Sequence, residues 1–318
     1  MKKMTRMLFI SDTHGSTPVF TKALGASAAY KAQVLVHGGD ILGKYMIPFY
    51  KAADGYEAEI LGVKELIRTP GEMKAAEAEV DRMGAYPLLT TREEWAELVA
   101  DADKMNPVFK AACEKRLKIW VEMAEQKLKP LGIKAFLNIG NDDYQSVGSM
   151  IEGYSCVVYP NNKVLMLDED HELLSLGNTN MTPWKCEGDV EEDQLLAMLE
   201  ALASKLQAPH RAVFNLHCPP VDTKLDVAPQ LDSELRPVYL PGGDPRMLHV
   251  GCKAVRTLIE RVQPLVGLHG HIHESKSIDK IGKTQVFNPG SEYTTGLLNS
   301  VLLNLSPDKV ESFMFLSA

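Results

Sequence analysis

The sequence predicts an α/β fold whose core is interrupted by a mostly helical insertion. Residues 7–10 and 34–37 are short apolar runs that each end at a polar loop. Pro18 begins a helical stretch between them, since proline is favoured at the first helical position. Strand, helix and strand in this order indicate a parallel βαβ unit.

Residues 41–130 break this rhythm and read as mostly helical. Thr91 followed by Glu94 matches a capping box. Apolar side chains then recur at helical spacing until Pro130. We therefore predict one domain, residues 1–318, with 41–130 as an inserted helical cap. Because it leaves from the loop that carries Asp40 and returns into the strand that leads to Asn141, we expect it to form a lid or wall over these loops. Its apolar stripe also permits the alternative of a contact in a homodimer.

Apolar runs resume after the insertion and predict further strands. The predicted strands lie at 133–139, 173–176, 212–216 and 265–268. The runs 157–159 and 164–167 flank a turn-forming segment and predict a hairpin. Residues 219–250, rich in Pro, Gly and Asp, predict a long functional loop. His171 lies between acidic residues, where we expect a solvated turn.

Charge and cysteine content narrow the function classes. The 318 residues include 42 acidic and 34 basic side chains, a net charge of −8, which argues against non-specific nucleic-acid binding. A small anionic substrate remains compatible, because a metal ion can supply local positive charge. The 5 cysteines form no CxxC pair and favour free thiols. We see no membrane-spanning run and expect a cytoplasmic protein without membrane partners.

Five predicted strand ends carry side chains that ligate metals. These are Asp12 with His14, Asp40, Asn141, His217, and His271 with His273. Strand ends are where α/β sheets build their sites. Residues two apart in extended chain point to the same side, so Asp12 and His14 can reach one metal together. His271 and His273 can do the same or reach two adjacent metals. Imidazole, carboxylate and amide donors without thiolate suit Mn, Fe, Zn, Co or Ni.

These motifs resemble the signature of the calcineurin-like metallophosphoesterases. The residues that carry the resemblance are Asp12-x-His14, Gly39-Asp40, Gly140-Asn141-x-Asp143, His217 and Gly270-His271-x-His273. Residues 86–87, 182–184 and 288–293 are similar to an archaeal and bacterial subgroup of that family. The resemblance is nearly chain-long. It implies two facing mixed β-sheets flanked by helices, an αββα sandwich.

The resemblance also implies a dinuclear, metal-dependent phosphoesterase that works through a metal-bridging hydroxide. Two divalent or trivalent ions would bind, the first to Asp12, His14 and His273. The second would bind to Asn141, His217 and His271. Asp40 would bridge both. The catalytic residues expected on this basis are Asp40, Asn141, Asp142 and His217.

Asp142 is a departure, because many members carry histidine there to assist the leaving group. A protonated Asp142 could substitute, but an ordinary carboxylate is ionised at neutral pH and repels phosphate. We therefore expect a small phosphorylated substrate, with phosphodiesters preferred. The alternatives are a phosphomonoesterase, a nuclease of the same superfamily, or a non-catalytic scaffold.

Other polar residues near these motifs are assigned supporting roles. His37 and His269 are expected to pack or to orient ligands. Lys44 could touch phosphate, but a surface lysine is favoured. One residue among Arg246, His249 and Arg256 could bind substrate, against a surface role for all of them.

Overall fold

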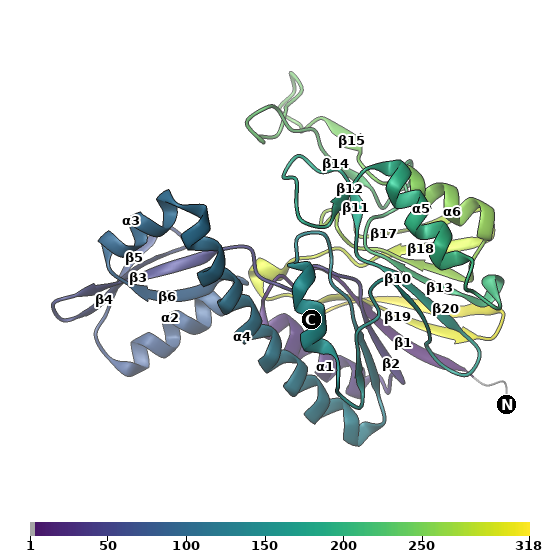
Figure 1. Ribbon diagram of the computed structural model, residues 1–318, viewed down its shortest axis with the longest axis horizontal. Helices are drawn as coiled ribbons and strands as arrows, with labels where there is room; N and C mark the ends of the chain where they lie inside the picture. The colour runs from purple at the N-terminus through teal and green to yellow at the C-terminus, as the bar shows by residue number, and fades with distance from the viewer. Residues whose placement is uncertain (1–3) are drawn as a thin grey trace.

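Two six-stranded mixed sheets form the core of the computed structural model, which describes residues 4–318 (Figure 1). Residues 1–3 of the predicted domain lie outside the described part. The first sheet has the order β20-β19-β1-β2-β7-β8 and the second β17-β18-β16-β13-β10-β9. The strands of the first sheet are β1 (Thr5–Ile10), β2 (Val34–His37), β7 (Lys134–Leu137), β8 (Val157–Val158), β19 (Asn299–Ser306) and β20 (Lys309–Ser317). Those of the second are β9 (Lys163–Met166), β10 (Glu172–Leu176), β13 (Val213–Leu216), β16 (Val266–Leu268), β17 (Ser277–Ile281) and β18 (Thr284–Asn288).

Alternation along each strand divides its side chains between two apolar layers. Phe9 and Phe136 of the first sheet share one buried cluster with Phe287 of the second, which places this layer between the sheets. Leu8 points the other way, into a cluster with α1 (Thr17–Ala29) and α4 (Ala102–Leu128). The second sheet packs outward in the same manner on α5 (Glu192–Ala203) and α6 (Lys253–Val262). The predicted αββα sandwich is confirmed.

The insertion, predicted to be mostly helical, combines helices with a four-stranded sheet that the sequence did not predict. Its four-stranded sheet has the order β5-β4-β3-β6 and lies to one side of the sandwich (Figure 1). Helix α4 runs from this insertion back to the sandwich. The elements are β3 (Met46–Ala52), β4 (Gly55–Ile60), β5 (Val63–Ile67), α2 (Pro70–Arg82), β6 (Tyr86–Thr90) and α3 (Arg92–Ala100). The helical interpretation missed these strands, of which β5 is exposed at four of its five positions. The capping box of Thr91 and Glu94 is present at the start of α3.

Two expectations about the second half of the chain are wrong. β8 pairs with β7 in the first sheet and β9 with β10 in the second, so residues 159–162 link the two sheets and no hairpin forms. His171 is buried rather than solvated, since its ring is held by Asp168 and by the carbonyl oxygen of Ser306.

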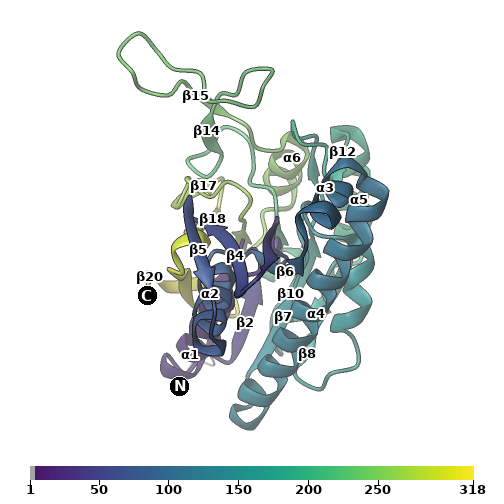
Figure 2. The same ribbon diagram turned by 90° about the vertical axis from the view of Figure 1, so that its left-hand side faces the viewer.

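The region 219–250 contains a two-stranded hairpin, β14 (Val227–Pro229) with β15 (Met247–His249), whose tip projects from the body (Figure 2). Another short pair, β11 (Thr179–Asn180) with β12 (Asp189–Val190), lies in the segment that follows β10. No helix among residues 4–318 has the length and apolar character needed to cross a membrane.

Candidate metal centre

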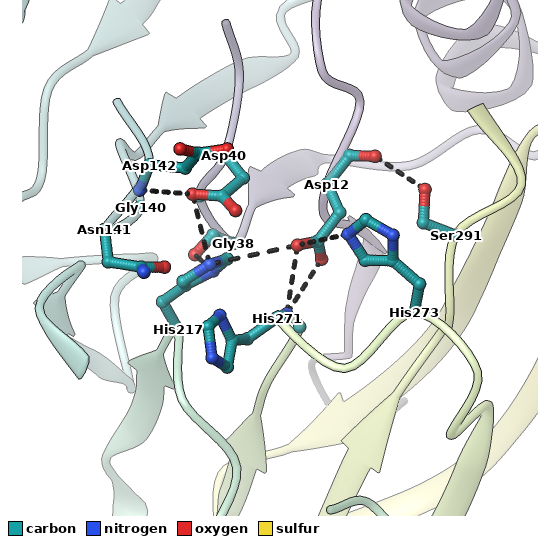
Figure 3. A network of polar contacts seen from close by, with 12 residues as sticks. Asp12, Gly38, Asp40, Gly140, Asn141, Asp142, His217, His271, His273 and Ser291 are labelled. Carbon is teal, nitrogen blue, oxygen red and sulfur yellow. Dashed lines mark hydrogen bonds and ion pairs between the residues drawn. The ribbon is translucent and has the colours of Figure 1, made fainter. Parts of the chain in front are cut away.

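The loops that leave five core strands meet at one place and bring the predicted ligands together (Figure 3). Backbone hydrogen bonds join neighbouring loops. The amide of Asp12 donates to Gly39 at 2.9 Å, and that of His14 donates to Asp40 at 3.0 Å. Across the two sheets, the side chain of Asp12 accepts the amide of His271 at 3.0 Å. The site therefore draws on both halves of the sandwich.

Four candidate ligands have left-handed backbone conformations, which only glycine adopts without cost. They are Asp12 (φ 55°), His14 (φ 39°), Asp40 (φ 54°) and His271 (φ 67°). Such strain costs about 1–3 kcal/mol per residue and persists where the surroundings over-determine the backbone, typically at functional sites. Because four such residues occur in these loops, we infer that the backbone conformation serves to orient the ligand side chains toward the centre.

Three groups of side chains have ligand atoms within 4.8 Å of one another and could hold metal ions. The groups are Asp12 with His14 and His273, Asp40 with His217 and His271, and His14 with Asp40 and Asp142. Asp40 belongs to two of them. Its Oδ2 lies 3.6 Å from His14 Nε2, and its Oδ1 lies 3.3 Å from His217 Nε2. Asp40 thus stands between the two sides of the centre.

The histidine tautomers favour metal binding. His217 Nδ1 lies 3.2 Å from the carbonyl oxygen of Gly38, and His14 Nδ1 lies 3.3 Å from that of Leu42. A ring nitrogen beside a carbonyl must carry the proton, which leaves the lone pair of a neutral ring on Nε2. Both Nε2 atoms point into the centre, where that of His217 is buried without a hydrogen-bond partner.

Asn141 is oriented by a residue that the sequence did not single out. Its Nδ2 donates to Asp189 Oδ1 at 2.8 Å, while its buried Oδ1 has no partner. Asp189 is itself held by Thr182 and by the amide of Cys186. A buried amide oxygen without a hydrogen-bond partner, in a site lined by carboxylates and imidazoles, fits a cation better than it fits a closed polar core. In the sequence, the one feature that could have drawn attention to Asp189 is its position shortly after residues 182–184, which carry part of the family resemblance.

Asp143 fastens two of the loops to each other. Its carboxylate accepts from the amides of Ile41, Leu42 and Gly140 at 3.0, 2.8 and 2.7 Å. Burial, reinforced by the Asp40 carboxylate, raises the pKa of Asp143 to about 7, whereas the three donors favour its charged form. Gly140 lets its loop lie against Asp40, because a Cβ at this position would be only 2.0 Å from Asp40 Oδ1.

The buried charges of the centre are strongly coupled. Burial, the largest single influence, would raise the pKa of Asp12 and of Asp40, but His217 and the other cationic neighbours together outweigh it and both pKa values are lowered. Burial opposes charge on His217, yet the carboxylates of Asp40 and Asp12 raise its pKa to about 9. A metal cation bound by these carboxylates would take the place of that proton.

Asp142 lies at the rim of the centre rather than inside it. Its amide donates to Asp40 Oδ1 at 3.2 Å, and its carboxylate lies 3.1 Å from Lys44 Nζ. The Tyr293 ring lies beside the rings of His14 and His273, with centroids 4.7 and 5.8 Å away. A pocket of about 400 Å³ opens from His273 along Tyr293. Lys44 is exposed, as expected for a surface lysine, and its side chain lies at this rim.

The remaining polar residues have structural partners. The ring of His37 contacts Thr13 Oγ1 at 2.8 Å and lies within hydrogen-bond distance of the amide of Gly39. His269 donates to backbone carbonyl oxygens, which matches the expected supporting role. Arg256 donates to two backbone carbonyl oxygens and to Glu260, and His249 pairs with Asp226. These contacts favour structural roles for both.

Comparisons with known proteins place the chain by its fold. No family model matches the sequence. An uncharacterised protein of Methanocaldococcus jannaschii, MJ1162, is 31% identical over 124 residues, which are 38% of this chain and 49% of that protein. The chain thus matches about half the length of this relative.

Solved structures align over almost the whole chain. One has a TM-score of 0.59 with 17% identity and covers 99% of both chains. TT1561 of Thermus thermophilus has a TM-score of 0.51 with 12% identity, over 96% of this chain and 100% of its own. A novel archaeal phosphodiesterase aligns at a TM-score of 0.34 with 11% identity, over 99% of this chain and 100% of its own, too remote a likeness to carry an argument. At these identities the likeness concerns the fold, which is the αββα sandwich that the resemblance to the calcineurin-like metallophosphoesterases predicts.

Proposed function

We propose that this protein is a dinuclear metal-dependent phosphoesterase that hydrolyses phosphate esters and prefers phosphodiesters. The observation that carries the proposal is the position of Asp40, whose two carboxylate oxygens face His14 on one side and His217 on the other. A carboxylate placed in this way suits two cations side by side. Bound there, the cations would activate water and neutralise charge on the phosphate.

The side chains divide into two ligand sets around Asp40. Asp12, His14 and His273 supply two nitrogens and a carboxylate on one side. His217 and His271 lie on the other side, where the free Oδ1 of Asn141 supplies an amide oxygen. This donor set fits Mn, Fe, Zn, Co or Ni, and manganese is our first choice for loading.

Asp142 and Lys44, at the rim of the centre, support the proposed preference for phosphodiesters. The Asp142 carboxylate lies 3.1 Å from Lys44 Nζ, where it would accept from the ammonium rather than serve as a general acid. Protonation of the leaving group by a general acid contributes about 10²–10⁴-fold to such reactions. A phosphodiester carries less charge than a monoester dianion and approaches the Asp142 carboxylate with less repulsion. We further propose a small phosphorylated ester as the partner, and the cytoplasm as the compartment, where the five free thiols would stay reduced.

Metal analysis combined with a substrate panel tests the proposal. Purified protein is loaded with manganese and assayed on phosphomonoesters, phosphodiesters, cyclic nucleotides and an oligonucleotide. Asp40→Asn protein prepared in parallel controls for contaminating phosphatases. Hydrolysis that depends on metal and on Asp40 supports the proposal. Faster monoester or oligonucleotide cleavage would favour a phosphomonoesterase or a nuclease, and metal binding without hydrolysis would favour a scaffold.

A further inference from the structure

Lys44 is held in place by a loop that is itself fastened to the metal centre. The amides of Ile41 and Leu42, just before it, bond to Asp143. The amide of Gly43 donates to the Tyr86 hydroxyl at 2.8 Å, which ties the loop to the insertion. The course of the backbone up to Lys44 is therefore determined, although the Lys44 side chain remains 38% exposed.

The ammonium of Lys44 faces the rim of the centre. Its Nζ lies 3.1 Å from Asp142 Oδ2, and Asp142 is placed beside Asp40 by the hydrogen bond of its amide. Burial alone would lower the pKa of Lys44, but the carboxylates of Asp40 and Asp142 outweigh it and the pKa is raised. Lys44 thus carries its charge next to the carboxylate that was expected to repel phosphate.

An anionic ester bound at Asp40 would lie close to Asp142, whose amide donates to Asp40 Oδ1 at 3.2 Å. An ammonium has three donors, and the Asp142 carboxylate can accept one of them, which leaves others for an incoming oxygen. Hydrogen bonds between a charged donor and a charged acceptor are about twice as strong as neutral ones. Lys44 can therefore offset Asp142 and contact phosphate at the same time.

We infer that Lys44 binds the substrate: its ammonium pairs with Asp142 and donates a charge-assisted hydrogen bond to a non-bridging oxygen of the phosphate ester. The inference rests on the proposed function. The competing explanation is that Lys44 only neutralises Asp142 and never touches the substrate.

A double-mutant cycle separates these two explanations. Lys44→Met keeps the apolar stem and removes the charge, and we expect kcat/KM for a bis-aryl phosphate to fall about 10–100-fold, mainly through KM. Lys44→Arg should recover part of the loss. In an Asp142→Asn background, Lys44→Met should remain costly. If Lys44→Met costs nothing in that background, Lys44 acts only on Asp142 and the inference is overturned.

A matched control is available in Lys163. Its Nζ lies 2.9 Å from Glu152, and its side chain is 41% exposed, close to the value for Lys44. Lys163→Met should leave kcat/KM unchanged. Thermal unfolding and metal content of every variant are measured first, so that lost structure or lost metal is not mistaken for lost substrate binding.

Calorimetry with inorganic phosphate separates failure of this inference from failure of the proposed function. Manganese-loaded wild type should bind phosphate about 10–100-fold more tightly than Lys44→Met. Lys44-dependent phosphate binding without ester hydrolysis would refute the proposed function and retain Lys44 as an anion-binding residue. Hydrolysis together with phosphate affinities that do not differ between the two proteins would refute the inference alone.

Discussion

His14 and His273 are 259 positions apart in the chain, yet their Nε2 atoms lie 3.1 Å from each other. His14 directs its Nδ1 to the carbonyl oxygen of Leu42, so the lone pair of its neutral ring lies on the nitrogen that faces His273. Asp12 Oδ1 lies 3.5 Å from His273 Nε2. Three donors that converge from two loops in this way form a ligand set that a cation would complete.

Removal of His273 should empty one side of the centre. We expect His273→Ala to lose the metal bound with Asp12 and His14 and to keep the other, with kcat/KM reduced at least about 100-fold, because even residues behind a ligand cost 10–100-fold. Elemental analysis after gel filtration measures the metal content. His249→Ala, a partly exposed histidine on the β14–β15 hairpin, is the control. Full metal content in His273→Ala would remove His273 from the ligand set.

Substitution of Asp40 should weaken both sides at once. Asp40→Asn retains the shape of the side chain but removes the negative charge that faces His14 and His217. We expect both metals to be lost and turnover to fall by at least about 100-fold. Elemental analysis and rates at saturating manganese provide the measurement. A variant that keeps two metals and full activity would contradict the shared position of Asp40.

Asp143 should matter for stability as well as for metal binding. Asp143→Ala leaves the buried amides of Ile41, Leu42 and Gly140 without their acceptor, and each unsatisfied group costs about 1–3 kcal/mol. We expect a loss of at least about 3 kcal/mol in unfolding free energy, measured by urea denaturation without metal. Asp143→Asn should recover part of it. Asp232→Ala, on the exposed hairpin tip, should change little. Equal stability of Asp143→Ala and wild type would refute the role.

His171 provides a pH-dependent contribution that is independent of the metal centre. Burial alone would lower the pKa of His171, but the Asp168 carboxylate, 2.7 Å from Nδ1, outweighs it and raises the pKa. Because the pKa is higher in the folded state, the contribution is complete below about pH 6.5 and is lost as pH rises through the folded-state value. His171→Gln should therefore cost about 1.5–3 kcal/mol near pH 6 and less at pH 9.

Urea denaturation of wild type and His171→Gln across this pH range tests the sign. The ring also contacts the carbonyl oxygen of Ser306 at the end of β19, and this contact connects the β9–β10 turn of one sheet to the other sheet. Asp168→Asn should flatten the pH dependence. A difference between wild type and His171→Gln that grows with pH would contradict the raised pKa.

The sequence was informative where an apolar strand runs into a polar loop. Strands such as residues 7–10 are buried on both faces, which leaves a continuous apolar signal, and the ligand motifs follow them directly. That the ligand motifs meet at one place depends on the order of the strands in both sheets, of which the βαβ rule predicts only the parallel pairs. The strands of the insertion escaped detection because β5 is exposed at four of its five positions and has no clear apolar face.

The supporting contacts could not be predicted from local pattern. Asp189 reaches Asn141 across 48 positions, and Lys44 reaches Asp142 across the whole length of the insertion. Acidic context around His171 suggested a solvated turn, whereas its burial results from the packing of a distant strand end. Such pairings are decided by tertiary structure, and the sequence shows at most that a residue lies near a motif, as Asp189 does after residues 182–184.

Asp142→His should increase monoester hydrolysis. In wild type, the Asp142 carboxylate lies 3.1 Å from Lys44 Nζ and accepts from its ammonium, so we expect bis-aryl phosphates to be cleaved faster than mono-aryl phosphates at matched metal loading. A histidine at this rim position could donate a proton and would remove a negative charge that repels a monoester dianion. We expect the monoester rate to rise by about 10-fold or more, and the diester rate to change less, since general-acid catalysis contributes about 10²–10⁴-fold when complete. Asp142→Asn, which removes the charge without supplying a proton, separates the two effects. Faster cleavage of monoesters than of diesters by the wild type would refute the preference, and equal rates for Asp142→His and Asp142→Asn would show that the charge alone is responsible.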